Sequence, residues 1–158
     1  ARQTGKVYLT LVQGAWQKPQ QTIDAALQKY TLTNGERRVR VVPKDHPDAM
    51  ASLSLVKLLK VHAPSPLAAG QASSLLAVTI KTGRTHQIRV HMAHAGHVIA
   101  GDDKYGDFDW NKQLNTAGLR RMFLHAWRLQ LTHPVTAQPM QLQCELPPDL
   151  LVWAKGVE

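Results

Sequence analysis

The sequence predicts an α+β fold in which a mixed, mostly antiparallel β-sheet is accompanied by a few short helices. Segments with strand-like composition outnumber helix-like segments, and glycine, proline and asparagine separate them. Few helical segments lie between successive strands, whereas a parallel sheet needs a long crossover, usually a helix, in each connection. The chain has 158 residues, of which 44% are hydrophobic, so it can form one domain with a core but has little room for two.

The predicted strands begin with Lys6 to Gly14, which is rich in β-branched and aromatic residues and stops at a glycine. Asn34-Gly35 is a strong signal for a hairpin turn. Glu36 to Val42 then alternates arginine with valine, which predicts a half-buried strand with a basic outer face. Five further strands are expected at residues 22–27, 50–61, 75–81, 123–131 and 140–146, although the composition of 50–61 also allows a helix.

A helix is predicted from about His86 to Ala95, because apolar residues recur there at helical spacing. Thr85 is a plausible N-cap and Gly96 a plausible C′ residue of this helix. Two more short helices are expected at residues 110–117 and 148–154. Residues 62–74 contain two prolines, one glycine and three serines, and are expected to form a surface loop.

The charge balance points to an anionic partner. Lysine and arginine total 19 against 11 acidic residues, which gives a net charge of +8. A polyanion such as RNA rewards this excess, because binding releases the counterions condensed on its phosphates. No apolar run approaches the roughly 18 residues of a membrane span, and no signal peptide is evident. The single cysteine, Cys144, excludes an internal disulfide and suits the cytoplasm.

The segment 82–106 is rich in histidine, arginine and aspartate, residue types that can bind a metal ion or an anion. His91, His94 and His97 are spaced by three, but no cysteine is close and no H-E-x-x-H arrangement follows, so no metal is expected. At the start of the predicted helix, unpaired backbone N–H groups would form an anion site. Arg84, placed there between Gly83 and Thr85, would add a guanidinium that fits phosphate.

Residue types alone do not decide the roles of two side chains, Arg89 and Tyr8. Arg89 is either a surface charge or the partner of a buried carboxylate. Tyr8 is either a core or edge aromatic, or a ring that stacks on a nucleobase while its hydroxyl handles a proton. Asp102 and Asp103 are not expected to act as an acid/base couple, because adjacent residues on an extended chain point apart.

Four ordered motifs resemble the ribosomal large-subunit pseudouridine synthases. The first is the strand Lys6-Val7-Tyr8-Leu9 with Val12 and Gly14, in which Thr10 replaces the usual alanine. The others are GRTHQIRVH at residues 83–91, GDDKYG at 101–106, and LHA with a later HP between 124 and 134. Four motifs in the right order over about 130 residues are a specific signal. Segments 34–37 and 107–109 are most similar to the C-type synthases.

The resemblance implies that uridine in large-subunit ribosomal RNA is isomerised to pseudouridine without metal or cofactor. By the same resemblance, Tyr8 stacks on the flipped base and is placed to take the C5 proton, and Arg89 pairs with the catalytic aspartate. A guanidinium keeps such an aspartate ionised, and a base must leave its stack before its glycosidic bond is reached. The expected substrate-binding residues are Arg84, Thr85, His86, Gln87 and Ile88. The expected RNA-backbone contacts are Arg37, Arg38 and Arg40.

One expected motif is absent. The family's nucleophile lies in a His-Arg-Leu-Asp motif upstream of the tyrosine strand, and no such tetrapeptide occurs in these 158 residues. We therefore expect residues 1–158 to be the C-terminal portion of a single catalytic domain, inactive alone, with the nucleophile and any RNA-binding domain upstream. A monomer is favoured. The alternative function is a non-catalytic, basic RNA-binding module.

Overall fold

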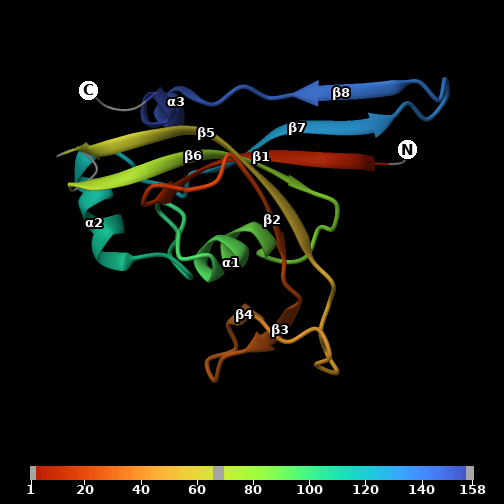
Figure 1. The fold of residues 1–158 in the computed structure, drawn as a ribbon, viewed down its shortest axis with the longest axis horizontal. Helices are drawn as coiled ribbons and strands as arrows, with labels where there is room; N and C mark the ends of the chain where they lie inside the picture. Colours follow the sequence, from red (N-terminus) through yellow and green to blue (C-terminus); the bar gives the residue numbers. More distant parts are fainter. Residues whose placement is uncertain (1–2, 66–69, 156–158) are drawn as a thin grey trace.

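The computed structural model describes residues 3–65 and 70–155 and has an α+β fold, as predicted (Figure 1). Six strands form one sheet in the order β2-β5-β6-β1-β7-β8, and every neighbouring pair in it is antiparallel. The strands of this sheet are β1 (Gln3–Gln13), β2 (Gln20–Asp24), β5 (Leu53–Ser65), β6 (Gln71–Ile80), β7 (Leu124–Thr132) and β8 (Pro139–Gln143). The remaining elements are the hairpin strands β3 (Leu27–Thr31) and β4 (Arg37–Val41) and the helices α1 (Gln87–His94), α2 (Phe108–Ala117) and α3 (Pro148–Lys155).

The sheet carries a hydrophobic core on each face, because successive residues of β1 point to opposite sides. Leu9 and Leu11 belong to one cluster, which Trp110 of α2 and Trp153 of α3 complete. The other cluster packs α1 against β1 and β6. Accordingly, α1 and α3 lie on opposite sides of the sheet (Figure 1). Strand β1, paired with β6 and β7, therefore lies at the centre of the fold and is held on both edges and both faces.

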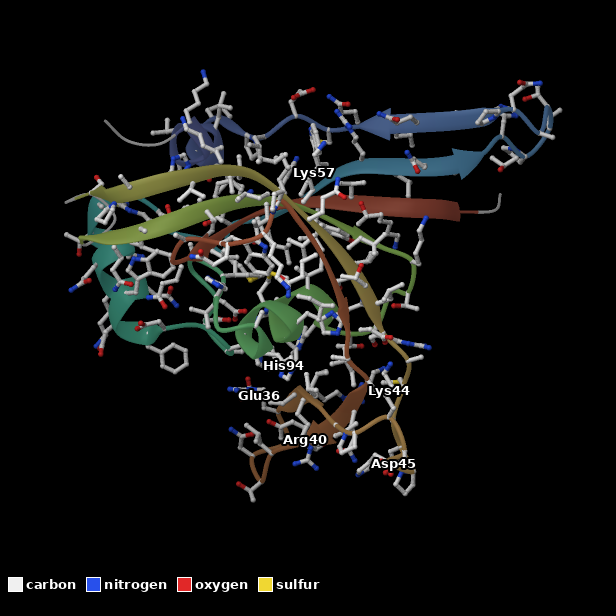
Figure 2. All side chains as sticks on the ribbon, viewed as in Figure 1. Glu36, Arg40, Lys44, Asp45, Lys57 and His94 are labelled. Carbon is white, nitrogen blue, oxygen red and sulfur yellow. The ribbon has the colours of Figure 1, made fainter. Side chains whose placement is uncertain are left out.

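The hairpin predicted at Asn34-Gly35 is confirmed, and it projects from the sheet beneath α1 (Figure 1). Gly35 has a φ of 88°, a left-handed conformation that glycine adopts without strain. The base of the hairpin packs on α1 through a small cluster of Leu27, Val39 and Val90. Figure 2 shows Glu36 and Arg40 on this projection. The strand expected at residues 22–27 is divided instead, since β2 ends at Asp24 and β3 begins at Leu27.

The prediction of a surface loop at residues 62–74 was wrong for most of these residues, which belong to strands. Strand β5 continues to Ser65 and β6 begins at Gln71, and the two strands still pair at His62–Ser73 and Ser65–Gln71. A register shift between these pairs accommodates Pro64, since a bulge tolerates the missing N–H that a regular central ladder would need. Residues 66–69 lie outside the described part of the chain.

The residue that follows the C-cap of α1 is the predicted one, although the helix ends at His94 and not at Ala95. Gly96 is the C′ residue, with its N–H bonded to Ala93 O and that of His97 bonded to Met92 O, which is a Schellman motif. At the other end the N-cap is His86 and not Thr85. His86 has a φ of 54°, so the helix begins one residue later than predicted.

The three histidines at 91, 94 and 97 have separate surroundings. Buried His91 donates from Nε2 to Ala25 O at 3.0 Å, and its Nδ1 lies 2.8 Å from Ser54 Oγ. His97 bonds through Nδ1 to Gln13 O at 2.8 Å, while His94 is exposed. Within the described residues, no group of three or more histidine, cysteine or acidic side chains is placed to hold a metal ion. None of the helices in the same residues is both long and apolar enough to cross a bilayer.

Burial of His91 makes the stability of the fold sensitive to acid. Burial lowers the pKa of His91, and the hydrogen bond to Ala25 only partly opposes this shift. Below its usual pKa of about 6.5 the unfolded histidine takes up a proton that folded His91 does not, so the free energy of unfolding falls as the pH drops below about 6.5. The variant His91→Asn should weaken this dependence. Urea unfolding at pH 7.5, 6.5 and 5.5 measures the free energy of unfolding as a function of pH. If this free energy fell equally with pH in the variant and the wild type, His91 would not be its cause.

Candidate active site

Tyr8 and Arg89, which are 81 positions apart in the sequence, line the same cavity of about 280 Å³. Tyr8 lies on the central strand β1 between Val78 and Ala126 of the neighbouring strands. Arg89 is the third residue of α1, and the packing of α1 on the sheet brings it to Tyr8. The other lining residues are Ile80, Arg84, His86, Gln87, Ile88, Met122 and Leu124. The cavity thus has aliphatic walls and a charged end, a combination that suits a nucleobase.

Arg89 is the partner of a buried carboxylate, which settles the first of the two open alternatives. Its Nε lies 3.0 Å from Asp102 Oδ2 and its Nη2 lies 2.7 Å from Asp102 Oδ1, so the pairing is bidentate. The side chain of Asp102 is 1% exposed and that of Arg89 is 11% exposed. Neighbouring Asp103 is 87% exposed and reaches Arg89 Nη2 at only 3.4 Å. Asp102 is therefore the buried partner of Arg89, and Asp103 reaches the same nitrogen only from the surface.

The electrostatics of the pair keep both groups ionised. Burial alone would raise the pKa of the Asp102 carboxyl, but hydrogen bonds from Arg89 and from the backbone N–H groups of Tyr105 and Lys104 outweigh it and lower that pKa. Burial likewise disfavours the charged form of Arg89, and the hydrogen bond and charge of Asp102 more than compensate, so the pKa of Arg89 is raised. A guanidinium and a carboxylate therefore face each other in the folded protein.

The loop that carries Asp102 is compact because glycine stands at both of its ends. Gly101 has a φ of 81°, and a Cβ on it would lie 2.5 Å from Arg121 O. A Cβ on Gly106 would overlap the carbonyl oxygen of Asp102. Asn111 of α2 holds the same loop through its side chain, accepting from the Gly101 N–H at 2.9 Å and donating to Asp102 O at 2.8 Å.

Tyr105 connects the hairpin to the cavity. Its hydroxyl accepts from the Val39 N–H at 2.9 Å and is hydrogen-bonded to His86 Nδ1 at 2.8 Å. Its ring centre lies 5.2 Å from Cζ of Arg89 and 5.7 Å from Cζ of Arg38, within the range of cation–π contact. Burial, reinforced by the positive charges of Arg89 and Lys104, lowers the pKa of His86, so His86 is neutral at pH 7.

The other residues expected to bind substrate have different surroundings. Thr85 is exposed and lies outside the lining of the cavity. Arg84 is an exposed lining residue whose Nε donates to Ala51 O at 3.1 Å. Ile88 is 5% exposed and belongs to the core cluster beneath α1.

The side chain of Gln87 is fully engaged within the protein. Its Oε1 accepts from Thr82 Oγ1 at 2.8 Å and from the Arg84 N–H at 3.2 Å. Its Nε2 donates to Leu53 O at 2.9 Å and to Ser54 Oγ at 3.1 Å. This network explains why Thr85 is not the cap, since Gln87 itself closes the turn that precedes the helix. Gln87 also accepts the hydrogen bond of the Arg84 N–H, one of the backbone groups that the predicted anion site would use.

The three hairpin arginines differ in their exposure to solvent. Arg37 is exposed, and so is Arg40, whose guanidinium stacks 4.7 Å from the ring centre of Tyr30. Arg38 is instead turned toward the loop at 101–106, where it donates to Lys104 O at 3.1 Å and to Glu36 at 3.3 Å. Arg38 and Arg40 alternate with buried Val39 along β4, but the loop supplies Arg38 with acceptors, so Arg38 is half-buried whereas Arg40 is exposed.

A second cavity, of about 320 Å³, also has Tyr8 in its lining and is lined mainly by apolar groups. Besides Tyr8, its lining residues are Lys6, Ala126, Trp127, Arg128, Leu129, Leu142, Gln143 and Cys144. We regard the cavity at Arg89 as the candidate site, because a ligand with polar groups needs fixed polar partners as well as an apolar surface to pack on. Residue types alone missed Asp102 and Tyr105 as members of that site, although both lie in the GDDKYG motif.

The comparisons with known proteins agree with this geometry. Residues 1–94 match the family described as RNA pseudouridylate synthase. A human protein, RNA Pseudouridylate Synthase Domain Containing 1, aligns with a TM-score of 0.71 and 25% identity over 98% of this chain and 66% of that chain. A second human structure, RNA Pseudouridylate Synthase Domain Containing 4, shares the fold with a TM-score of 0.64 at 21% identity. The chain belongs to the RNA pseudouridylate synthase family.

Within the family, the chain is similar to ribosomal large subunit pseudouridine synthase C of several bacteria. It is 40% identical over 141 residues to the protein of Haemophilus influenzae and 41% identical over 143 residues to that of Escherichia coli. Each alignment covers 89% of this chain. The chain spans about 40% of the length of these relatives. The similarity to C-type synthases expected from the sequence is thereby confirmed.

The contribution of the hydrogen bond between Val39 N–H and the Tyr105 hydroxyl to stability can be tested by removing the hydroxyl. Tyr105→Phe keeps the ring but leaves the Val39 N–H without its partner, so the free energy of unfolding should fall by about 1–3 kcal/mol. Tyr30→Phe, in which the ring also stacks beneath an arginine of the hairpin, is the matched control and should change it by less than about 0.5 kcal/mol. Urea denaturation measures both, and equal effects would refute the role of the hydroxyl.

Proposed function

We propose that the complete protein isomerises uridine to pseudouridine in large-subunit ribosomal RNA. In this proposal residues 1–158 form the C-terminal portion of a single catalytic domain that works in the cytoplasm, as a monomer and without metal or cofactor. The observation that carries the proposal is the cavity shared by Tyr8 and Arg89, the two residues that match the family's catalytic tyrosine and arginine. Membership of the family and the names of the similar proteins support the choice of reaction.

The proposed reaction replaces the bond between uracil N1 and the ribose with a bond between uracil C5 and the same ribose carbon. The bond from uracil N1 to the ribose breaks, the freed base turns, and C5 bonds to the same ribose carbon. C5 then loses its proton and N1 gains one, so the product is an isomer of the substrate. Tyr8 would stack on the extruded base and take the C5 proton with its hydroxyl, while Arg89 would hold the nucleophilic carboxylate in its ionised form.

The nucleophile is assigned to no residue of this chain. All the aspartates of the sequence lie outside a His-Arg-Leu-Asp motif, and Asp102 is already committed to Arg89. We propose that another part of the complete protein supplies the nucleophile and that residues 1–158 alone are inactive. Arg84 and His86 at the cavity would contact the bound nucleotide, Gln87 and Ile88 would shape its wall, and Thr85 would act from the rim.

The exposed arginines of the hairpin would contact RNA phosphates. Arg37 and Arg40 lie on a projection that reaches away from the sheet, and the net charge of +8 favours a polyanion. Arg38 has acceptors within the protein, so its contribution to RNA binding would be smaller than that of its neighbours.

The role of Tyr8 as a base is tested with Tyr8→Phe in the complete protein. The phenyl ring still stacks, so RNA affinity should stay within about threefold of wild type. Release of tritium from RNA labelled at uracil C5 should fall by at least about 10²-fold, because general base catalysis contributes that much. Tyr30→Phe is the control and should release tritium at the wild-type rate. Wild-type release by Tyr8→Phe would remove the proton-transfer role, and RNA binding without release by the wild-type protein would favour the binding module.

The different surroundings of Arg38 and Arg40 predict different effects of salt on RNA affinity when each is replaced. Arg40→Gln in the complete protein should reduce the slope of log affinity against log salt by about 0.7, the value for one phosphate contact on single-stranded RNA. Arg38→Gln should leave this slope nearly unchanged and instead lower the free energy of unfolding, because its hydrogen bonds are internal. Filter binding across a salt series measures the slopes. Equal slopes for Arg40→Gln and wild type would mean that Arg40 contacts no phosphate.

A further inference from the structure

The guanidinium of the candidate site is fixed from within the protein before any RNA arrives. The carboxylate of Asp102 accepts four hydrogen bonds: from Arg89 Nε at 3.0 Å, from Arg89 Nη2 at 2.7 Å, from the Lys104 N–H at 2.9 Å and from the Tyr105 N–H at 3.0 Å. The last two tie the carboxylate to its own loop. Asp102 therefore connects a rigid loop to the side chain of Arg89.

This arrangement divides the donors of Arg89 into two groups. Nε and Nη2 are directed to Asp102 and, at the surface, to Asp103. Among the described residues no acceptor bonds to Nη1, and Arg89 lines the cavity with Tyr8. A guanidinium is planar, so fixing its Nε–Nη2 edge also fixes the direction of Nη1. The nitrogen left for a ligand is thus held in one position.

We propose that Asp102 is a positioning residue for the isomerisation: it holds the plane of Arg89 and balances its charge, so that Nη1 alone is presented to the contents of the cavity. This inference rests on the proposed function. It assigns Asp102 no contact with substrate and no proton transfer. It also explains why a buried carboxylate lies next to a site that must receive a polyanion, since an unbalanced Arg89 would be free to pair with any phosphate that entered.

The fold of the loop does not depend on the carboxylate alone. Asn111 bonds both to the Gly101 N–H and to Asp102 O, so the backbone on either side of Asp102 has a separate anchor. The other charged and titratable groups around the pair are Asp103, Lys104 and Tyr105 on the loop, His86 at the N-cap of α1, and Glu36 and Arg38 on the hairpin. A variant that removes only the charge of Asp102 should therefore fold.

The test compares Asp102→Asn with Asp103→Asn in the complete protein. The amide introduced by Asp102→Asn would place an N–H donor against Arg89, so the guanidinium would move. We expect kcat for tritium release to fall on the order of 10²-fold, as for a displaced catalytic group. KM should stay within about threefold, since the lost interaction is not with bound RNA. Asp103→Asn, which loses the exposed contact, should stay within about twofold of wild type in both constants.

A spectroscopic measurement separates positioning from a general loss of structure. In the wild-type protein the Arg89 Nε–H should give a slowly exchanging NMR signal, identified by its absence in Arg89→Lys. The signal should persist in Asp103→Asn and disappear in Asp102→Asn. If Asp102→Asn does not fold, Asp102→Glu keeps the charge but displaces the carboxylate by one methylene, and it should show the same loss of kcat.

The outcomes distinguish this inference from the proposed function. Absence of tritium release from the wild-type protein would refute the function. An active wild type together with a folded Asp102→Asn or Asp102→Glu that keeps kcat within about twofold would overturn the inference. A rapidly exchanging Arg89 Nε–H in the wild-type protein would overturn it as well, whatever the variants do.

Discussion

The buried ion pair between Arg89 and Asp102 is the interaction on which the geometry of the site depends. Removing two charges from water costs several kcal/mol per ion, and only good geometry with further hydrogen bonds offsets it. Here the bidentate contact and the two backbone N–H groups supply that geometry. Because the pair joins α1 to the loop at 101–106, it also fixes Tyr105, and through Tyr105 the hairpin. One electrostatic contact thus sets the relative positions of three segments.

The second half of the site comes from the sheet. Tyr8 lies on β1, which has a paired strand on each edge and a hydrophobic cluster on each face. Such a strand moves little, so Tyr8 and Arg89 are each held by a different rigid part of the molecule. This is the arrangement that catalysis requires when a tyrosine must meet one atom of a base. The hairpin, in contrast, projects from the sheet and presents Arg40 to solvent, which suits contact with an RNA backbone.

Local patterns predicted most of the fold, and contacts between distant segments account for what they missed. Strand β1, the turn at Gly35 and the end of α1 at Gly96 follow from residue types at fixed positions. The extension of β5 and β6 was missed because a partner strand, not composition, satisfies the backbone around Pro64. For the site, the motifs indicated Tyr8 and Arg89. The partner of Arg89 could not be chosen from the sequence, since the carboxylate lies on a loop whose direction depends on close packing at Gly101.

The most direct test of this account is a crystal structure of the complete protein bound to an RNA that contains its target uridine. The account predicts that the uracil lies outside the RNA stack, against the ring of Tyr8, with Arg89 Nη1 facing the bound nucleotide and the bond to Asp102 intact. A uracil bound in the other cavity, against Trp127 and Leu142, with Arg89 remote from it, would contradict the account.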